Sequence, residues 1–192
     1  MTRDFITLVC GFGRCGSSLV MQMLHAGGMP CVGKFPAFED EHTLDEIPPK
    51  WMVENVGKAM KLLDPQRVKP PHGFSYKAVW LNRGYIQQAR SQVKFLKILS
   101  GLGKESDVPK LVASYKRDKP LAMTTLAAIG AEVIQLSFED ILVFPRTAAF
   151  KLSKLVGDLD IDAMVDAVVP RPPECAVGLD MEMALIEKWG DK

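Results

Sequence analysis

The feature that most constrains the fold is a glycine-rich turn near the start of the chain, in the segment LVCGFGRCGSSLVMQML at residues 8–24. A short apolar run leads into the turn, four residues separate Gly11 from Gly16, and a helical pattern follows. A strand, such a turn and a helix together hold a phosphate, because successive backbone N–H groups and the helix N-terminus face one anion. The segment therefore predicts an α/β protein that binds a phosphorylated ligand.

This turn differs from the loop of nucleotide triphosphatases in the position of its positive charge. In the pattern G-x-x-x-x-G-K-[ST] a lysine reaches the β- and γ-phosphates, and the next hydroxyl binds magnesium. Here Ser17 and Ser18 follow the second glycine, and Arg14 is the cation of the loop. Ser18 could still bind a metal, with Glu139-Asp140 as the candidate carboxylates. The loop therefore disfavours an ordinary ATP or GTP hydrolase.

Hydrophobic periodicity gives the expected secondary structure. Short apolar segments typical of strands cover 5–10, 74–81, 93–99 and 132–137. Helical patterns cover 17–26, 107–117, 119–130, 147–156 and 180–189. Alternating strands and helices predict one three-layer α/β domain over residues 1–192, with a central, mostly parallel sheet flanked by helices. Ligands of such sheets bind beyond the carboxyl ends of the strands, which places the glycine-rich loop at the functional edge.

Residues 30–73 interrupt this alternation with many prolines and the acidic run Glu39-Asp40-Glu41. We expect an irregular excursion with a central helix near 50–63. Long insertions of this kind often serve as lids or substrate loops, and a plain surface connection is the alternative.

Composition restricts the class of protein. The chain has 192 residues, of which 47% are hydrophobic and 24% charged, and its formal net charge is +1. These values are typical of a globular domain and give no indication of nucleic-acid binding or of a membrane surface. No uncharged apolar run of 18 residues and no signal-peptide pattern is visible, so we expect a cytoplasmic protein. The four cysteines include no C-x-x-C pair, so we expect no metal site.

The segment GFGRCGSSLVMQML resembles the 5′-phosphosulfate loop of the sulfotransferase family, whose pattern is roughly G-x-x-[RK]-[ST]-G-[ST]-[ST]. Cys15 departs from that pattern. A second stretch, residues 133–164, is similar to the family's late strand, its Tyr-Glu-Asp-Leu-type turn, a proline and a helix, with Phe138-Glu139-Asp140-Ile141 in place of the turn. The resemblance implies the co-substrate 3′-phosphoadenosine 5′-phosphosulfate, and a small-molecule, glycan or peptide acceptor with a hydroxyl or amine.

The same resemblance implies a binding site at the loop. Carried over by position, residues 13–18 would hold the 5′-phosphosulfate, with side-chain contacts from Arg14, Ser17 and Ser18. The remaining loop members are Gly13, Cys15 and Gly16. In-line transfer of a sulfuryl group needs positioning and charge neutralisation and does not require a metal.

The family's 3′-phosphate site follows another pattern, in which a strand is followed by an arginine and then by a serine about two helical turns later. The expected strand 93–99 ends without that arginine, so Lys104 would supply the cation and Ser114 the hydroxyl. A rival register uses Arg117 and Thr125. The remaining interpretation is that these are surface groups and that no 3′-phosphate is bound.

Several residues are candidates for catalysis. The family commonly uses a histidine or a carboxylate as the general base, and His42, Glu39 and Glu41 lie in the excursion while His72 precedes a strand. Surface roles fit His42 and His72 equally well. Lys77, in SYKAVWL, lies where the family often has a lysine that stabilises the transferring group.

The sequence thus favours a sulfotransferase-like enzyme and leaves two alternatives. One is a small P-loop kinase that uses Ser18 for magnesium and Arg117 or Lys104 for phosphates. The other is a module that binds a nucleotide without catalysis. The pattern indicates neither the acceptor nor the oligomeric state.

Overall fold

The structure is a computed structural model that describes residues 3–169. Its centre is a four-stranded sheet made of β1 (Ile6–Gly11), β2 (Ala59–Leu63), β3 (Tyr76–Asn82) and β4 (Glu132–Ser137). The strand order is β2-β1-β3-β4, and every neighbouring pair is parallel. This arrangement confirms the expected α/β fold with a parallel central sheet.

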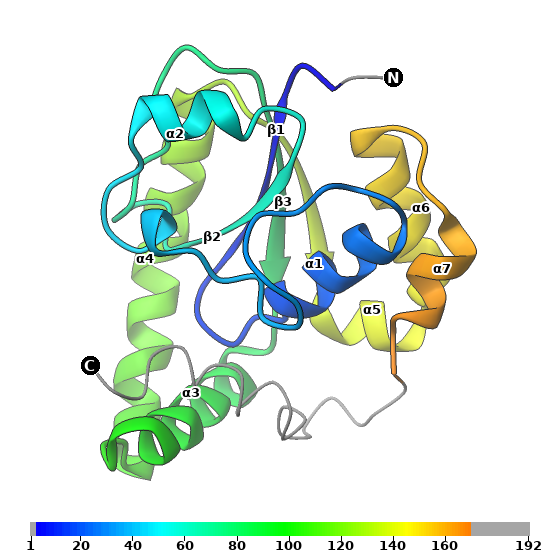
Figure 1. The fold of residues 1–192 in the computed structure, drawn as a ribbon. Coiled ribbons are helices and arrows are strands. Elements are labelled where there is room, and N and C mark those ends of the chain that lie inside the picture. Colours follow the sequence, from blue (N-terminus) through cyan, green and yellow to red (C-terminus); the bar gives the residue numbers. More distant parts are fainter. Residues whose placement is uncertain (1–2, 170–192) are drawn as a thin grey trace.

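Helices cover both faces of the sheet and complete three layers (Figure 1). One face carries α1 (Ser17–Ala26), α5 (Phe138–Val143), α6 (Pro145–Val156) and α7 (Ile161–Asp166), and the other carries α2 (Pro49–Glu54), α3 (Tyr85–Ser100) and α4 (Val108–Ala128). Side chains of β1 alternate between the two cores, with Val9 in the first and Leu8 and Cys10 in the second. Two short 3-10 helices, η1 (Glu41–Thr43) and η2 (Glu105–Asp107), lie in connections.

The parallel arrangement brings the carboxyl ends of all four strands to one edge. The glycine-rich loop follows β1 there, and Asp64, Arg83 and Phe138 follow β2, β3 and β4. The predicted position of the loop beyond the carboxyl ends of the strands is therefore confirmed.

The predicted strand at 93–99 is wrong, because these residues belong to the long helix α3. Val93 and Phe95 alternate with Lys94, which imitates the period of a strand. The buried side chains of α3 are Gln88, Ala89 and Val93. Because Ala89 and Val93 are four residues apart and Gln88 is adjacent, all three lie on the face of the helix that packs against the sheet.

The predicted helix near 50–63 is only partly correct. Helix α2 ends at Glu54, and residues 59–63 form the edge strand β2. The sequence AMKLL has no β-branched residue, so local propensity gives little sign of a strand. Pairing with β1 over five residues, together with burial of Ala59, Met60 and Leu62, imposes the extended conformation.

Two predicted helices at 107–117 and 119–130 form the single helix α4, which continues through Pro120. Burial of Tyr115, Ala122 and Leu126 on both sides of the proline stabilises the helix despite the missing N–H donor. The predicted helix at 180–189 lies outside the described residues. Within residues 3–169, no helix is both long and apolar enough to cross a membrane.

Candidate functional site

The loop between β1 and α1 has the backbone of an anion site. Gly16 is the N-cap of α1 with φ 100°, and no side chain within the described part of the chain caps that helix end. The helix dipole places partial positive charge on the N–H groups at this end of α1, and such an end can hold an anion. Arg14 also takes a left-handed conformation, with φ 67°, at the tip of the loop.

Gly16 is required by its surroundings as well as by its backbone angle. A Cβ atom on this residue would lie 2.5 Å from the ring of Phe138. Phe138 opens the Phe-Glu-Asp-Ile turn after β4, so the two segments that resemble the sulfotransferase family pack directly against each other. The guanidinium of Arg83 lies 4.4 Å from the centre of the same ring.

Helix α3 fixes the other side of the loop. Gln88 is buried, and its Nε2 donates to the carbonyl oxygens of Phe12 at 3.1 Å and Gly13 at 2.9 Å. A Cβ atom on Gly13 would lie 2.6 Å from Gln92 Oε1. The absence of a side chain at this position therefore permits the close packing of the loop against the helix. The loop is therefore held in shape by hydrogen bonds from outside itself.

Arg14 lies against the same helix. Its Nε donates to Ser91 Oγ at 3.3 Å, and its guanidinium lies 4.8 Å from the centre of the Phe95 ring. Arg83, directly after β3, donates through Nη1 to the carbonyl oxygen of Arg14 at 2.9 Å. Two arginines and one serine hydroxyl thus meet at the tip of the loop.

Arg83 and Ser91 are the functional candidates that sequence reasoning missed. They are eight residues apart, Arg83 directly follows a strand, and Ser91 lies two turns into the next helix. This is the strand, arginine and serine order expected for a 3′-phosphate site. The pattern is visible in LNRGYIQQARS, where Asn82 ends β3, whereas a strand at 93–99 points to residues further along the chain.

The residues predicted for that role lie elsewhere. Ser114 and Arg117 lie on α4, where both donate to Asp118 of the same helix, and the side chain of Arg117 is exposed. Lys104 precedes η2, and its backbone N–H donates to Asp107. The structure shows no contact of these three residues with the loop, whereas it brings Arg83 and Ser91 to Arg14.

A buried lysine from β2 supplies a further charge beside the loop. Lys61 Nζ donates to Ser18 Oγ at 2.8 Å and to Glu39 Oε1 at 2.6 Å, and only 3% of the Lys61 surface is exposed. Burial lowers the pKa of Lys61, and the nearby Glu39 carboxylate opposes that shift. Ser18 donates in turn to the carbonyl oxygen of Ala37 at 3.4 Å, which ties the start of the excursion to α1.

Cys15 is fully buried within the loop, and burial raises the pKa of its thiol to about 11. The thiol is therefore protonated at neutral pH. The side chain serves as a small apolar group packed in the core beneath the loop, and a reactive thiolate is not supported.

His42 and Lys77 occupy different surroundings from the loop. His42 Nδ1 lies 2.9 Å from Asp40 Oδ1, and its ring stacks on Trp51 at 4.9 Å. Lys77 pairs in register with Thr7 near the start of β1, donates to the carbonyl oxygen of Leu155 at 2.6 Å and covers the Phe5 ring. The glycine-rich loop follows the opposite end of β1, so the structure does not bring Lys77 and Arg14 together.

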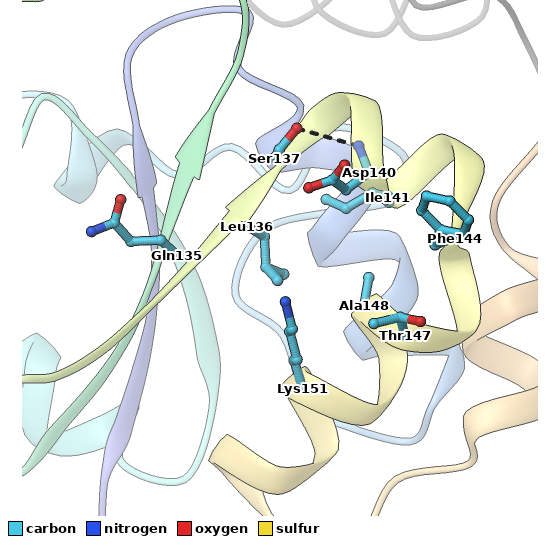
Figure 2. Close-up of a pocket in the computed structure, with 9 residues that line it drawn as sticks. All are labelled: Gln135, Leu136, Ser137, Asp140, Ile141, Phe144, Thr147, Ala148 and Lys151. Carbon is cyan, nitrogen blue, oxygen red and sulfur yellow. Dashed lines mark hydrogen bonds between the residues drawn. The ribbon is translucent and has the colours of Figure 1, made fainter.

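A cavity of ≈ 250 Å³ lies beside the Phe-Glu-Asp-Ile turn, between the end of β4 and helices α5 and α6. Figure 2 shows Lys151 extending into it from α6, and Ser137 accepting a hydrogen bond from the backbone N–H of Asp140. On the other side of the turn, Glu139 Oε1 accepts from the backbone N–H of Gly84 at 3.0 Å. The turn thereby connects the ends of β3 and β4.

No protein-family model matches the chain, and no curated protein matches it in sequence. Solved structures do share its fold. The mouse sulfotransferase SULT7A1 complexed with PAP superposes with a TM-score of 0.59 at 12% identity, covering 86% of this chain and 62% of that chain. Retinol dehydratase in complex with androsterone and inactive cofactor PAP gives a TM-score of 0.54 at 14% identity, covering 86% of this chain and 64% of that chain.

The chain therefore spans less than two thirds of the length of either protein. At this level of identity the likeness shows a common fold.

Proposed function

We propose that the chain transfers a sulfuryl group from 3′-phosphoadenosine 5′-phosphosulfate to a hydroxyl or amine acceptor. The observation that carries this proposal is the meeting of Arg14, Arg83 and Ser91 at the tip of a glycine-rich loop. The likeness in fold to two proteins solved with PAP supports it. The acceptor class, small molecule, glycan or peptide, remains part of the proposal.

The chemistry of the side chains fits a donor with phosphate at both ends. The side chains around the loop are cationic or carry hydroxyl groups, and the backbone N–H groups of α1 add hydrogen-bond donors. We assign the 5′-phosphosulfate to residues 13–18 and the 3′-phosphate to Arg83 and Ser91. Lys104, Ser114 and Arg117 have no part in this assignment, because their contacts are with α4 and η2.

The reaction forms one bond to sulfur and breaks another. The acceptor oxygen or nitrogen attacks the sulfur, the bond from sulfur to the 5′-phosphate oxygen breaks, and 3′-phosphoadenosine 5′-phosphate leaves. The acceptor proton passes to a base on the protein, and negative charge builds on the leaving phosphate. Arg14 and Lys61 are the cations that would stabilise that charge, and contacts with helix α3 and with Glu39 hold them in position.

We assign the role of general base to Glu39. Its carboxylate lies 2.6 Å from Lys61 Nζ, and Lys61 contacts Ser18 of the loop, so Glu39 is linked to the donor site through one side chain. His42, the other predicted base, contacts Asp40 and Trp51 instead.

A pair of variants distinguishes the two bases. We expect Glu39→Gln to lower kcat by about 10²-fold, because a neutral amide cannot accept the acceptor proton. We expect His42→Gln to change kcat by less than about threefold. Initial rates of 3′-phosphoadenosine 5′-phosphate release across an acceptor panel measure both. A large loss in His42→Gln with an active Glu39→Gln would reassign the base to His42.

The 3′-phosphate assignment predicts a nucleotide preference. We expect 3′-phosphoadenosine 5′-phosphate to bind about 10- to 100-fold more tightly than adenosine 5′-phosphate, because charge-assisted hydrogen bonds contribute about 1.5–3 kcal/mol. Arg83→Met and Ser91→Ala should each reduce this preference in titration calorimetry. Lys104→Met and Ser114→Ala are the matched controls and should retain it. A preference lost in the controls and kept in Arg83→Met would contradict the assignment.

The kinase alternative receives no support from the site. The Ser18 hydroxyl, which would have to bind magnesium, accepts a hydrogen bond from the Lys61 ammonium at 2.8 Å. A cation so close opposes a second cation on the same oxygen. A module that binds 3′-phosphoadenosine 5′-phosphate without transfer to any acceptor remains the second candidate, and the acceptor panel distinguishes it.

A further inference from the structure

A second cavity, of ≈ 430 Å³, lies away from the loop. It is bounded by the end of α1, by the segment that follows α1, and by the residue that precedes β2. The side chains that matter here are His25, Met29, Phe35, Phe38 and Lys58. Its volume falls within the range of about 300–1,000 Å³ that is usual for small-molecule sites.

The walls of this cavity are aromatic. Phe38 is buried and lies 5.4 Å from the His25 ring and 6.1 Å from the Phe35 ring, measured between ring centres. Phe35 is 68% exposed and lies at the rim of the cavity, so its ring is accessible to a ligand. The Phe35 and Phe38 rings meet edge to face, with 88° between their planes, so a flat ligand ring that lies against Phe35 would cover aromatic surface that the protein leaves in water.

The backbone of this segment is strained. Phe38 has φ 54°, a left-handed conformation that a bulky residue rarely adopts. The turn also depends on Gly33, where a Cβ atom would lie 2.6 Å from the backbone of Phe38. Such strain persists where the surroundings hold a side chain in place for binding or catalysis. Here it aims the Phe38 ring at the cavity and its neighbour Glu39 at Lys61.

The formal charge of the cavity lining is positive. It comes from Lys58, and none of the described residues that line the cavity is acidic. Lys58 Nζ donates to the neutral Asn55 Oδ1 at 3.0 Å, and no carboxylate of residues 3–169 lies within 4 Å of it. The cavity therefore combines an aromatic wall with an ammonium that has no counter-ion within ion-pair distance in the described chain.

The cavity is separate from the glycine-rich loop. Ser18 lies at the start of α1 and His25 near its end, seven residues later, which corresponds to about 10 Å along the helix axis. The segment before Phe38 runs between these points, because Gln22 donates to the carbonyl oxygen of Pro36 and Ser18 to that of Ala37. A ligand in the cavity would contact neither Arg14 nor the N-terminus of α1.

We propose that this cavity binds a small aromatic carboxylate, with its ring against Phe35 and Phe38 and its carboxylate on Lys58. The proposal does not depend on the sulfuryl-transfer function, because it uses none of the residues assigned to the donor.

Naphthalene-2-carboxylate and the neutral naphthalene-2-carboxamide form a matched pair of probes, titrated by calorimetry into the full chain. We expect the carboxylate to bind with Kd below about 1 mM and the amide to bind about tenfold more weakly. Phe35→Ala and Lys58→Met should each weaken carboxylate binding about tenfold. Phe150→Ala and Lys154→Met, which alter exposed residues of α6, are the controls and should bind like the parent chain.

A saturating concentration of 3′-phosphoadenosine 5′-phosphate separates this site from the donor site. Carboxylate binding that is unchanged by the nucleotide supports the proposal, and it does so even if the nucleotide itself fails to bind. Competition between the two ligands, equal binding of the amide, or no binding of the carboxylate up to about 10 mM would each overturn it.

Discussion

Replacing Arg14 with alanine should lower kcat/KM for sulfuryl transfer by about 10²–10³-fold, the loss typical of removing one group that stabilises developing charge. Arg14 lies at the tip of the glycine-rich loop, with Nε 3.3 Å from Ser91 Oγ and its guanidinium over the Phe95 ring. These contacts order the side chain before the donor binds, so little entropy remains to be lost in the transition state. Release of 3′-phosphoadenosine 5′-phosphate under initial-rate conditions measures the effect.

Arg90→Ala is the matched control for this prediction. Arg90 lies on the same helix as Ser91 and Phe95, is mostly exposed and pairs with Glu105 at 3.1 Å. We expect its removal to change kcat/KM by less than about threefold, because exposed ion pairs contribute at most about 1 kcal/mol. Equal losses in Arg14→Ala and Arg90→Ala would mean that general positive charge, and not the loop cation, supports the reaction.

The second large effect concerns stability. We expect Lys61→Met to lower the free energy of unfolding by about 3–5 kcal/mol, because it leaves the Glu39 carboxylate in the interior without its ammonium partner. The side chains of Lys61 and Glu39 are only 2% and 13% exposed, and their charged atoms lie 2.6 Å apart. The same substitution removes the donor to Ser18 Oγ. Urea unfolding followed by circular dichroism measures the change.

Two further variants make this prediction specific. Adding Glu39→Leu to Lys61→Met should recover most of the lost stability, because apolar replacement of both members of a buried pair is often close to neutral. Lys77→Met, in the neighbouring part of the sheet, should cost about 1 kcal/mol, because Lys77 is partly exposed and loses one hydrogen bond. A double variant no more stable than Lys61→Met would show that the ion pair is not the source of the loss.

The loop and its flanking elements could be predicted because their signals are local. The glycines, the apolar run before them and the helical stripe after them lie within residues 8–24, and β1 and α1 appear where expected. The Phe-Glu-Asp-Ile turn was equally visible, although its packing against Gly16 is a tertiary contact that no local pattern encodes.

Other parts of the site depend on long-range pairing. Strand β2 has the composition of a helix and is extended only because it pairs with β1, so neither the strand nor the inward direction of Lys61 could be predicted. Glu39 was one of several acidic residues in an irregular segment, and only the contact with Lys61 distinguishes it.

The incorrect prediction of residues 93–99 had the largest consequence. A strand at this position points to Lys104 and Ser114 as the candidates for a 3′-phosphate site. The structure instead has strand β3 before helix α3, and Arg83 and Ser91 follow β3 at the spacing of the pattern, which is why we propose them for that role. Short segments rich in Val, Phe, Leu and Ile fit a buried helix and a strand equally well, and the sheet decides between them.

The central claim is that the loop and its neighbours accept a 3′-phosphorylated nucleotide and not a metal-bound triphosphate. Thermal unfolding in the presence of each ligand tests this claim most directly. At a concentration about a hundredfold above its Kd, 3′-phosphoadenosine 5′-phosphate should add about 2.7 kcal/mol to the stability of the chain, and ATP with magnesium should add none. Stabilisation by ATP with magnesium, without stabilisation by 3′-phosphoadenosine 5′-phosphate, would contradict the account.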